Sequence, residues 1–118
     1  MMMKKILLID DDETTLNLLH EFIDYYFNCL VKVAHDGREG IKLIKHGYDY
    51  DLVITDINMP FVDGNEVARH IKVSNKSEIP IIAVTGSCSD IINPDFFSII
   101  LSKPFKANHL KQAIEWLI

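Results

Sequence analysis

The residues of this sequence best suited to chemistry are carboxylates. Residues 10–13 read DDDE, and Asp56 follows a separate apolar stretch. Taken singly, such residues are ordinary helix caps and turn formers. If Asp10, Asp11 and Asp56 lie about 5 Å apart, each pair repels by roughly 3 kcal/mol at an effective dielectric of about 20. A hard divalent cation such as Mg²⁺, which prefers oxygen ligands, would offset that repulsion.

A hydroxyl and an ammonium group complete the candidate set. Thr85 follows the apolar stretch 81–84, and Lys103 follows the stretch 98–101. The lysine amine is a compact, mobile point charge that suits an anionic oxygen, and the threonine hydroxyl donates a hydrogen bond. These residues act together with the carboxylates only if the chain brings all four stretches to one place.

The apolar stretches before these residues are predicted to be parallel strands. They are rich in β-branched side chains and continuous rather than alternating, as in a sheet covered on both faces. The predicted strands are Lys5–Ile9, Leu30–Ala34, Leu52–Thr55, Ile81–Val84 and Ser98–Leu101.

The segments between the strands have helical spacing, with apolar side chains three and four residues apart. The predicted core positions are Leu16, Leu19, Ile23, Tyr26 and Phe27, then Gly64, Val67, Ala68 and Ile71, and finally Leu110, Ala113, Ile114 and Leu117. Residues Gly37–Gly47 form a weaker helix with Ile41 and Ile44 inward. Pro94 interrupts the segment before the last strand, so a short helix or irregular loop is expected there.

This alternation predicts an α/β fold, a doubly wound five-stranded parallel sheet with helices on both faces and right-handed crossovers. Ligands of such sheets bind outside the carboxyl ends of the strands. The candidate carboxylates, hydroxyl and ammonium group should therefore converge at one edge of the sheet.

The motifs resemble the signature of response-regulator receiver domains. They are ILLIDDDE at 6–13, DLVITDINMPFVDG at 51–64, the pair Thr85-Gly86, and the triplet 103–105, which reads KPF. The resemblance covers essentially the whole chain and implies one receiver domain over residues 1–118. It also implies the flavodoxin-like strand order 2-1-3-4-5.

The resemblance implies a phosphoacceptor and a magnesium site. Asp56 corresponds to the acceptor, which also contacts the metal. Asp11 would bind Mg²⁺ directly, and Asp10 would bind it through water. The main-chain carbonyl of Asn58 would be a further ligand. Asp12 and Glu13 fall outside the acidic pair and should begin the first helix.

The same resemblance implies which residues respond to phosphorylation. Lys103 would pair with a phosphoryl oxygen, and its peptide bond to Pro104 is expected to be cis. Thr85 would move to donate a hydrogen bond to the new phosphoryl group, so that a local change in charge biases a partner-binding surface. Asp63 and Gly64 should form the turn into the third helix.

The function implied is that of a phosphoacceptor in a two-component system. A histidine kinase or histidine phosphotransfer protein would donate the phosphoryl group, and an unknown output protein or domain would read it. The domain is expected to assist its own phosphorylation and dephosphorylation rather than act as an ordinary enzyme. A receiver-fold interaction module and a hybrid-kinase receiver in a phosphorelay are the alternatives. A flavin carrier would need a loop that binds phosphate after the first strand. The acidic run at residues 10–13 would repel phosphate and argues against that function.

One position departs from the family pattern. Receivers usually carry an aromatic residue three positions before the lysine, where this chain has Ile100. Ile100 has no ring to rotate, so we hypothesise that acceptor chemistry is intact but its readout is atypical. Phe96 and Phe97 are candidates for substitute partner contacts, although a core role is the favoured interpretation.

The length and composition limit the domain count, the possible partners and the expected cellular location. A length of 118 residues suits one domain. No apolar run reaches the roughly 20 residues that span a bilayer, and the net charge of −5 without a basic cluster argues against direct nucleic-acid binding. Cys29 and Cys88 follow no secretory signal, so reduced thiols and a cytoplasmic location are expected.

Overall fold

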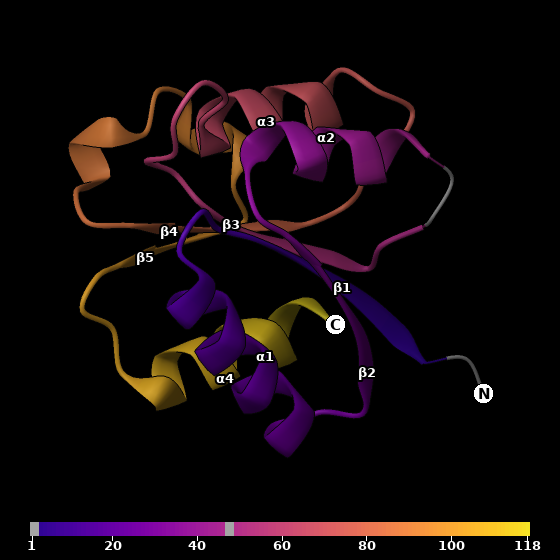
Figure 1. Cartoon of the computed structure of the whole chain (residues 1–118), viewed down its shortest axis with the longest axis vertical. Coiled ribbons are helices and arrows are strands. Elements are labelled where there is room, and N and C mark those ends of the chain that lie inside the picture. The colour runs from indigo at the N-terminus through magenta and orange to yellow at the C-terminus, as the bar shows by residue number, and fades with distance from the viewer. Residues whose placement is uncertain (1–2, 47–48) are drawn as a thin grey trace.

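The computed structural model describes residues 3–46 and 49–118. Five parallel strands form one sheet in the order β2-β1-β3-β4-β5, which confirms the predicted order (Figure 1). The strands are β1 (Lys4–Ile9), β2 (Cys29–Ala34), β3 (Leu52–Asp56), β4 (Ile81–Thr85) and β5 (Ile99–Ser102). Every predicted strand boundary lies within one residue of the observed one.

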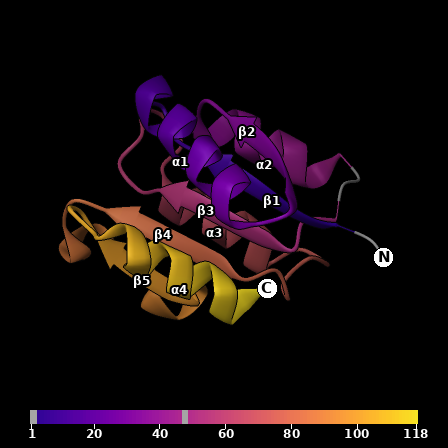
Figure 2. The same cartoon turned by 90° about the horizontal axis from the view of Figure 1, so that it is seen from below.

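Four helices cover the two faces of the sheet. Helices α1 (Glu13–Tyr26) and α4 (Ala107–Leu117) lie on one face, and α2 (Gly37–Lys45) and α3 (Gly64–Lys72) lie on the other (Figures 1 and 2). The predicted second helix reached Gly47, which lies outside the described residues. Within those residues, no helix has both the length and the apolar character needed to cross a membrane.

Strands β3 and β4 are buried throughout and β1 is buried from Ile6 on, whereas β5 is only partly buried. Strand β2 also corrects the prediction of continuous burial. It is an edge strand whose exposure alternates. Cys29, Val31 and Val33 pack against the core on the α1–α4 face. Leu30, on the opposite face, is 51% exposed because no buried cluster covers it.

The prediction of a buried Tyr26 is also wrong, because this residue is 49% exposed. Tyr26 is the last residue of α1, and its ring lies against Phe22 and Tyr25 rather than in the core. Phe27, one residue later, packs against the core on the α1–α4 face instead.

The segment between β4 and β5 has no α-helix, as its proline predicted. Two short 3₁₀ helices, η1 (Cys88–Asp90) and η2 (Pro94–Phe96), replace it. Phe97 is buried in the core and Phe96 only packs against it, so the favoured core role is confirmed for Phe97.

The turn into α3 holds the end of β3 in place. The Asp63 carboxylate caps the helix by accepting a hydrogen bond from the Glu66 peptide N–H at 2.9 Å. The Gly64 peptide N–H donates to the Ile57 carbonyl at 2.9 Å. A Cβ atom on Gly64 would overlap the carbonyl oxygen of Asp56, so glycine permits this close approach to the candidate acceptor.

Candidate functional site

The register of the parallel sheet brings the ends of its strands together. Asp56 at the end of β3 pairs with Val84, and Thr85 at the end of β4 pairs with Ser102 in β5. Asp10 directly follows β1, which lies beside β3. All the predicted site residues therefore lie at the carboxyl edge of one sheet.

The three predicted acidic residues form a cluster. Asp10, Asp11 and Asp56 each offer a carboxylate oxygen, and these atoms lie within 4.8 Å of one another. Asp10 is 3% exposed and Asp56 is 8% exposed, whereas Asp11 faces solvent. Two of the three negative charges are thus removed from water.

Burial raises the pKa of both inner carboxylates. Desolvation, aided by the charges of Asp56 and Asp11, raises the pKa of Asp10 from 3.8 to about 6. A hydrogen bond from the Asp12 peptide N–H to Asp10 Oδ1, at 2.9 Å, opposes this shift. Burial also raises the pKa of Asp56, against the attraction of the Lys103 ammonium.

Lys103 reaches the candidate acceptor from β5. Its Nζ lies 3.3 Å from Asp56 Oδ1, which also accepts a hydrogen bond from the Ile57 peptide N–H at 2.9 Å. The Lys103 peptide N–H donates to the Thr85 carbonyl at 2.7 Å and ties β5 to β4. The peptide bond from Lys103 to Pro104 is cis, as predicted.

Thr85 is fully buried, but its hydroxyl does not bond Asp56. Thr85 Oγ1 donates to the Ser87 carbonyl at 2.9 Å and accepts from the Ser87 peptide N–H at 3.2 Å. To donate a hydrogen bond to a group on Asp56, this hydroxyl must therefore give up its hydrogen bond to the Ser87 carbonyl.

Hydrogen bonds connect Asn58 to Asp90, and Asp90 to Asn65, and the sequence did not reveal this connection. The side-chain amide of Asn58 donates to the Asp90 carboxylate at 2.7 Å. Asn65 on α3 donates to the Asp90 carbonyl at 2.8 Å and accepts from the Ile92 peptide N–H at 3.0 Å. These partners lie 25 to 32 residues apart in the chain, and no motif or spacing marks them. The predicted metal contact of the Asn58 carbonyl stays a prediction.

The donor chemistry of the acidic cluster fits Mg²⁺. Hard carboxylate oxygens are the ligands that this ion prefers, and it commonly retains several waters. Lys103 supplies one positive charge against three carboxylates. A bound dication would compensate the remaining charge and lower the raised pKa of Asp10.

The response regulator receiver domain family matches residues 6–115, and the chain belongs to this family. It is a receiver domain of two-component systems, whose standard function is to accept a phosphoryl group.

Among its relatives, transcription factor SKN7 of Saccharomyces cerevisiae is 38% identical over 112 residues, covering 89% of this chain and 17% of SKN7. The autoinducer 2 sensor kinase/phosphatase LuxQ of Vibrio parahaemolyticus is 31% identical over 113 residues, covering 92% of this chain and 13% of LuxQ. The chain thus spans less than a fifth of either relative. The crystal structure of response regulator TrrA from Thermotoga maritima in complex with Mg²⁺-BeF is 31% identical, has a TM-score of 0.88, and covers 98% of this chain and 100% of TrrA.

Proposed function

We propose that Asp56 accepts a phosphoryl group from a histidine kinase or a histidine phosphotransfer protein. One observation carries the proposal: Asp10, Asp11 and Asp56 converge within 4.8 Å beside the Lys103 ammonium. A sheet edge with no use for a cation would not gather three carboxylates, because their mutual repulsion is costly. The expected setting is the cytoplasm, in keeping with the free thiols of Cys29 and Cys88.

The same residues account for a metal requirement. Asp11, Asp56 and the Asn58 main-chain carbonyl would hold Mg²⁺ directly, and Asp10 would hold it through water. The bound ion would neutralise charge on the transferred group. TrrA, whose structure carries Mg²⁺-BeF, supports this assignment by similarity.

The chain's own residues position the transfer. Oδ1 of Asp56 accepts from Ile57 and lies beside Lys103, which leaves the other oxygen to form the bond to phosphorus. As that bond forms, the phosphorus–nitrogen bond of the donor phosphohistidine breaks, and its electron pair returns to the imidazole. Phosphoryl transfer depends mainly on such positioning and charge compensation. The same groups would assist the later attack of water.

The readout is proposed to differ from that of aromatic-switch receivers. Ile100 packs against the core on the α2–α3 face and has no ring to reorient. Thr85 instead ties its hydroxyl to Ser87. When this hydroxyl donates to the phosphoryl group, it gives up its hydrogen bond to the Ser87 carbonyl, which loosens the attachment of the segment 86–98 at one end.

A hybrid-kinase receiver in a phosphorelay is the second candidate. The similarity to LuxQ, a sensor kinase/phosphatase, favours it. The similarity to SKN7, a transcription factor, equally favours a receiver that controls an output domain. The two differ in where the phosphoryl group goes next, and the acceptor chemistry is the same.

The direct test uses acetyl phosphate as donor. The wild-type chain, incubated with acetyl phosphate and Mg²⁺, should gain one phosphoryl group in its intact mass, and Asp56→Asn should gain none. Chelation of Mg²⁺ should abolish the gain in the wild type. Equal gain in both proteins would reject Asp56 as the acceptor.

Lys103 can be tested in the same assay. Lys103→Ala should fold normally, yet its rate of phosphorylation should fall by about 100-fold, because a preorganised charge at the reacting group is lost. Lys106→Ala, which removes an exposed lysine three residues away, is the matched control. Loss of the fold in Lys103→Ala would show that the ammonium group is structural.

A further inference from the structure

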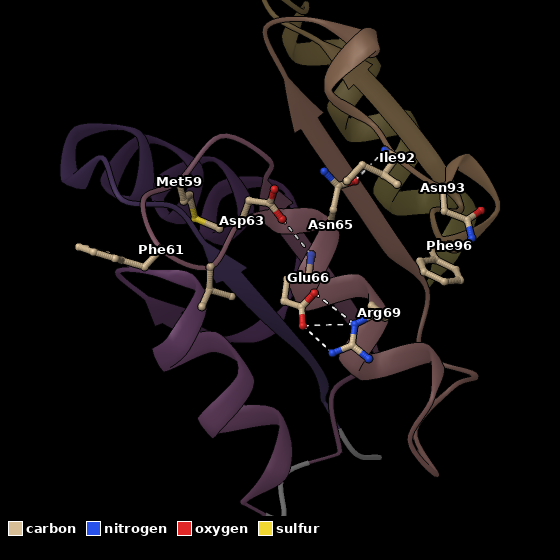
Figure 3. A pocket seen from close by; sticks show the side chains of 10 residues that line it. Met59, Phe61, Asp63, Asn65, Glu66, Arg69, Ile92, Asn93 and Phe96 are labelled. Atoms are coloured by element: carbon tan, nitrogen blue, oxygen red, sulfur yellow. Dashed lines mark hydrogen bonds and ion pairs between the residues drawn. The ribbon is translucent and has the colours of Figure 1, made fainter.

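A groove of about 580 Å³ lies beside the acceptor site. It runs between the loop after β3, the first turns of α3, and the segment 86–98 (Figure 3). Its apolar lining comes from Met59, Phe61, Val62, Ile92 and Phe96. We call it the α3 groove.

Two of these apolar residues are displayed to solvent. Phe61 is 89% exposed and Ile92 is 80% exposed. Phe61 also has a φ of 67°, a backbone conformation that L-residues other than glycine rarely adopt. Strained residues tend to gather where function demands them, and exposed apolar side chains around a groove favour an interaction site.

The walls of the groove are already in place. The side-chain amide of Asn65 bonds both the Asp90 carbonyl and the Ile92 peptide N–H, which fixes the segment 86–98 against α3. Asn58, on the loop 57–63 between β3 and α3 (the acceptor loop), donates to the Asp90 carboxylate and so holds it. A preformed groove lowers the ordering cost of binding a partner.

The charged side chains around the groove indicate the charge that a partner should carry. Asp63 and Glu66 line the groove. Asp95 stands on η2, which contributes Phe96 to the lining, and Asp90 ends η1, two residues before the lining residue Ile92.

Arg69 is the one cationic side chain among the lining residues, and it is engaged in an ion pair with Glu66. A second cation, the Arg38 guanidinium, lies over the Phe61 ring, 4.9 Å from its centroid. Carboxylates therefore outnumber cations around an apolar centre, an arrangement complementary to a basic, amphipathic partner.

We propose that the α3 groove binds an amphipathic helix of a partner protein. Apolar side chains of that helix would pack on Ile92 and Phe96, and lysine or arginine residues beside them would face the carboxylates. The lining residues come from the loop after β3, helix α3 and the segment Ile92–Phe96, so the groove offers no strand edge to extend. A helix with apolar anchors three and four residues apart suits such a surface. The site lies beyond the proposed phosphoryl transfer and does not depend on it.

The probe is a phage-displayed library of random peptides, selected on the wild-type chain and counter-selected on Ile92→Glu. Enriched peptides should carry apolar residues at helical spacing together with lysine or arginine. A synthetic copy of the most enriched peptide should bind Ile92→Glu roughly tenfold or more weakly by fluorescence anisotropy, as expected for an interface anchor. Asp95→Lys should weaken binding too, because it reverses a charge at the rim.

Leu18→Glu is the matched control, since Leu18 is 63% exposed on α1, on the other face of the sheet. It should bind the peptide like the wild type. Asp56→Asn should bind the peptide as well as the wild type does. The assignment of Asp56 as phosphoacceptor and the assignment of the α3 groove as a binding site can therefore fail independently. Ile92→Glu should still gain a phosphoryl group from acetyl phosphate, which shows that it is folded. Absence of enrichment, enrichment of acidic peptides, or equal binding to Ile92→Glu would each overturn the proposal.

Discussion

Asp10 and Asp56 are carboxylates from which the fold excludes almost all water. Their exposed fractions are 3% and 8%, and burial raises the pKa of each. An ionised carboxylate in such a place is costly unless a cation compensates it. The cost would be offset by a bound divalent cation, which the clustered carboxylates of Asp10, Asp11 and Asp56 are suited to hold.

The first prediction concerns Asp10. Its pKa is about 6 in the folded chain against an ordinary 3.8, so ionisation of Asp10 opposes folding. The penalty is absent below pH 4, grows between about pH 4 and 6, and is complete above pH 6. Asp10→Asn should therefore raise the free energy of unfolding at pH 8, without Mg²⁺, by up to about 3 kcal/mol. Urea denaturation at pH 8 and pH 4.5 measures this difference.

The control for Asp10 is Asp95→Asn, which changes an exposed carboxylate on η2. It should shift stability by under about 0.5 kcal/mol at both pH values. Mg²⁺ should stabilise the wild type more than Asp10→Asn, since the ion compensates a charge that the variant lacks. A stabilisation by Asp10→Asn that does not shrink at pH 4.5 would contradict the electrostatic explanation.

At the scale of elements, the segment 86–98 is the unusual part of the fold. It is held at Ser87 by Thr85 and at Asp90 by Asn58 and Asn65. Side chains of β4, of the loop after β3 and of α3 thus hold this segment, which has no α-helix of its own. A change at the acceptor site can therefore reach the surface through these few bonds.

The second prediction tests this attachment. Asp90→Ala removes the acceptor of the Asn58 amide and should lower the free energy of unfolding by about 0.5–1.5 kcal/mol. Amide hydrogen exchange should accelerate at Ile91 and Ile92, while β4 stays protected. Asp95→Ala, on the same segment, should leave exchange unchanged. Unaltered exchange in Asp90→Ala would show that the Asn65 contacts alone hold the segment.

At the scale of the whole molecule, the sheet divides the core in two. One buried cluster lies on the α2–α3 face and the other lies on the α1–α4 face. Ile71 in α3 and Ile23 in α1 are both fully buried, one in each cluster. The strands between them carry side chains to both sides.

The third prediction follows from this division. Ile23→Val and Ile71→Val should each lower the free energy of unfolding by about 0.5–1.5 kcal/mol. Because the two sites share no cluster, the double variant should show the sum of both losses to within about 0.5 kcal/mol. Chemical denaturation of the wild type, the two single variants and the double variant gives the free energies of this double-mutant cycle. A coupling energy above about 1 kcal/mol would show that packing is transmitted through the sheet.

The sequence by itself determined the elements and the order of the motifs. Strand boundaries and the capped turn at Asp63 depend on local periodicity and on side chains a few residues apart, which the sequence displays directly. The parallel arrangement then predicted that Asp10, Asp56 and Lys103 would meet at one edge. Their agreement with the structure follows from the rule that parallel strands end together.

Only the tertiary structure decided what depends on contacts between distant segments. The exposure of Tyr26 and Leu30 could not be deduced from periodicity, since it depends on which neighbours cover the end of α1 and the edge strand. The link from Asn58 through Asp90 to Asn65 joins residues far apart in the chain and has no local signature. The distances within the acidic cluster and the raised pKa of Asp10 were likewise set by packing, because burial and electrostatic interaction exist only once the chain has folded.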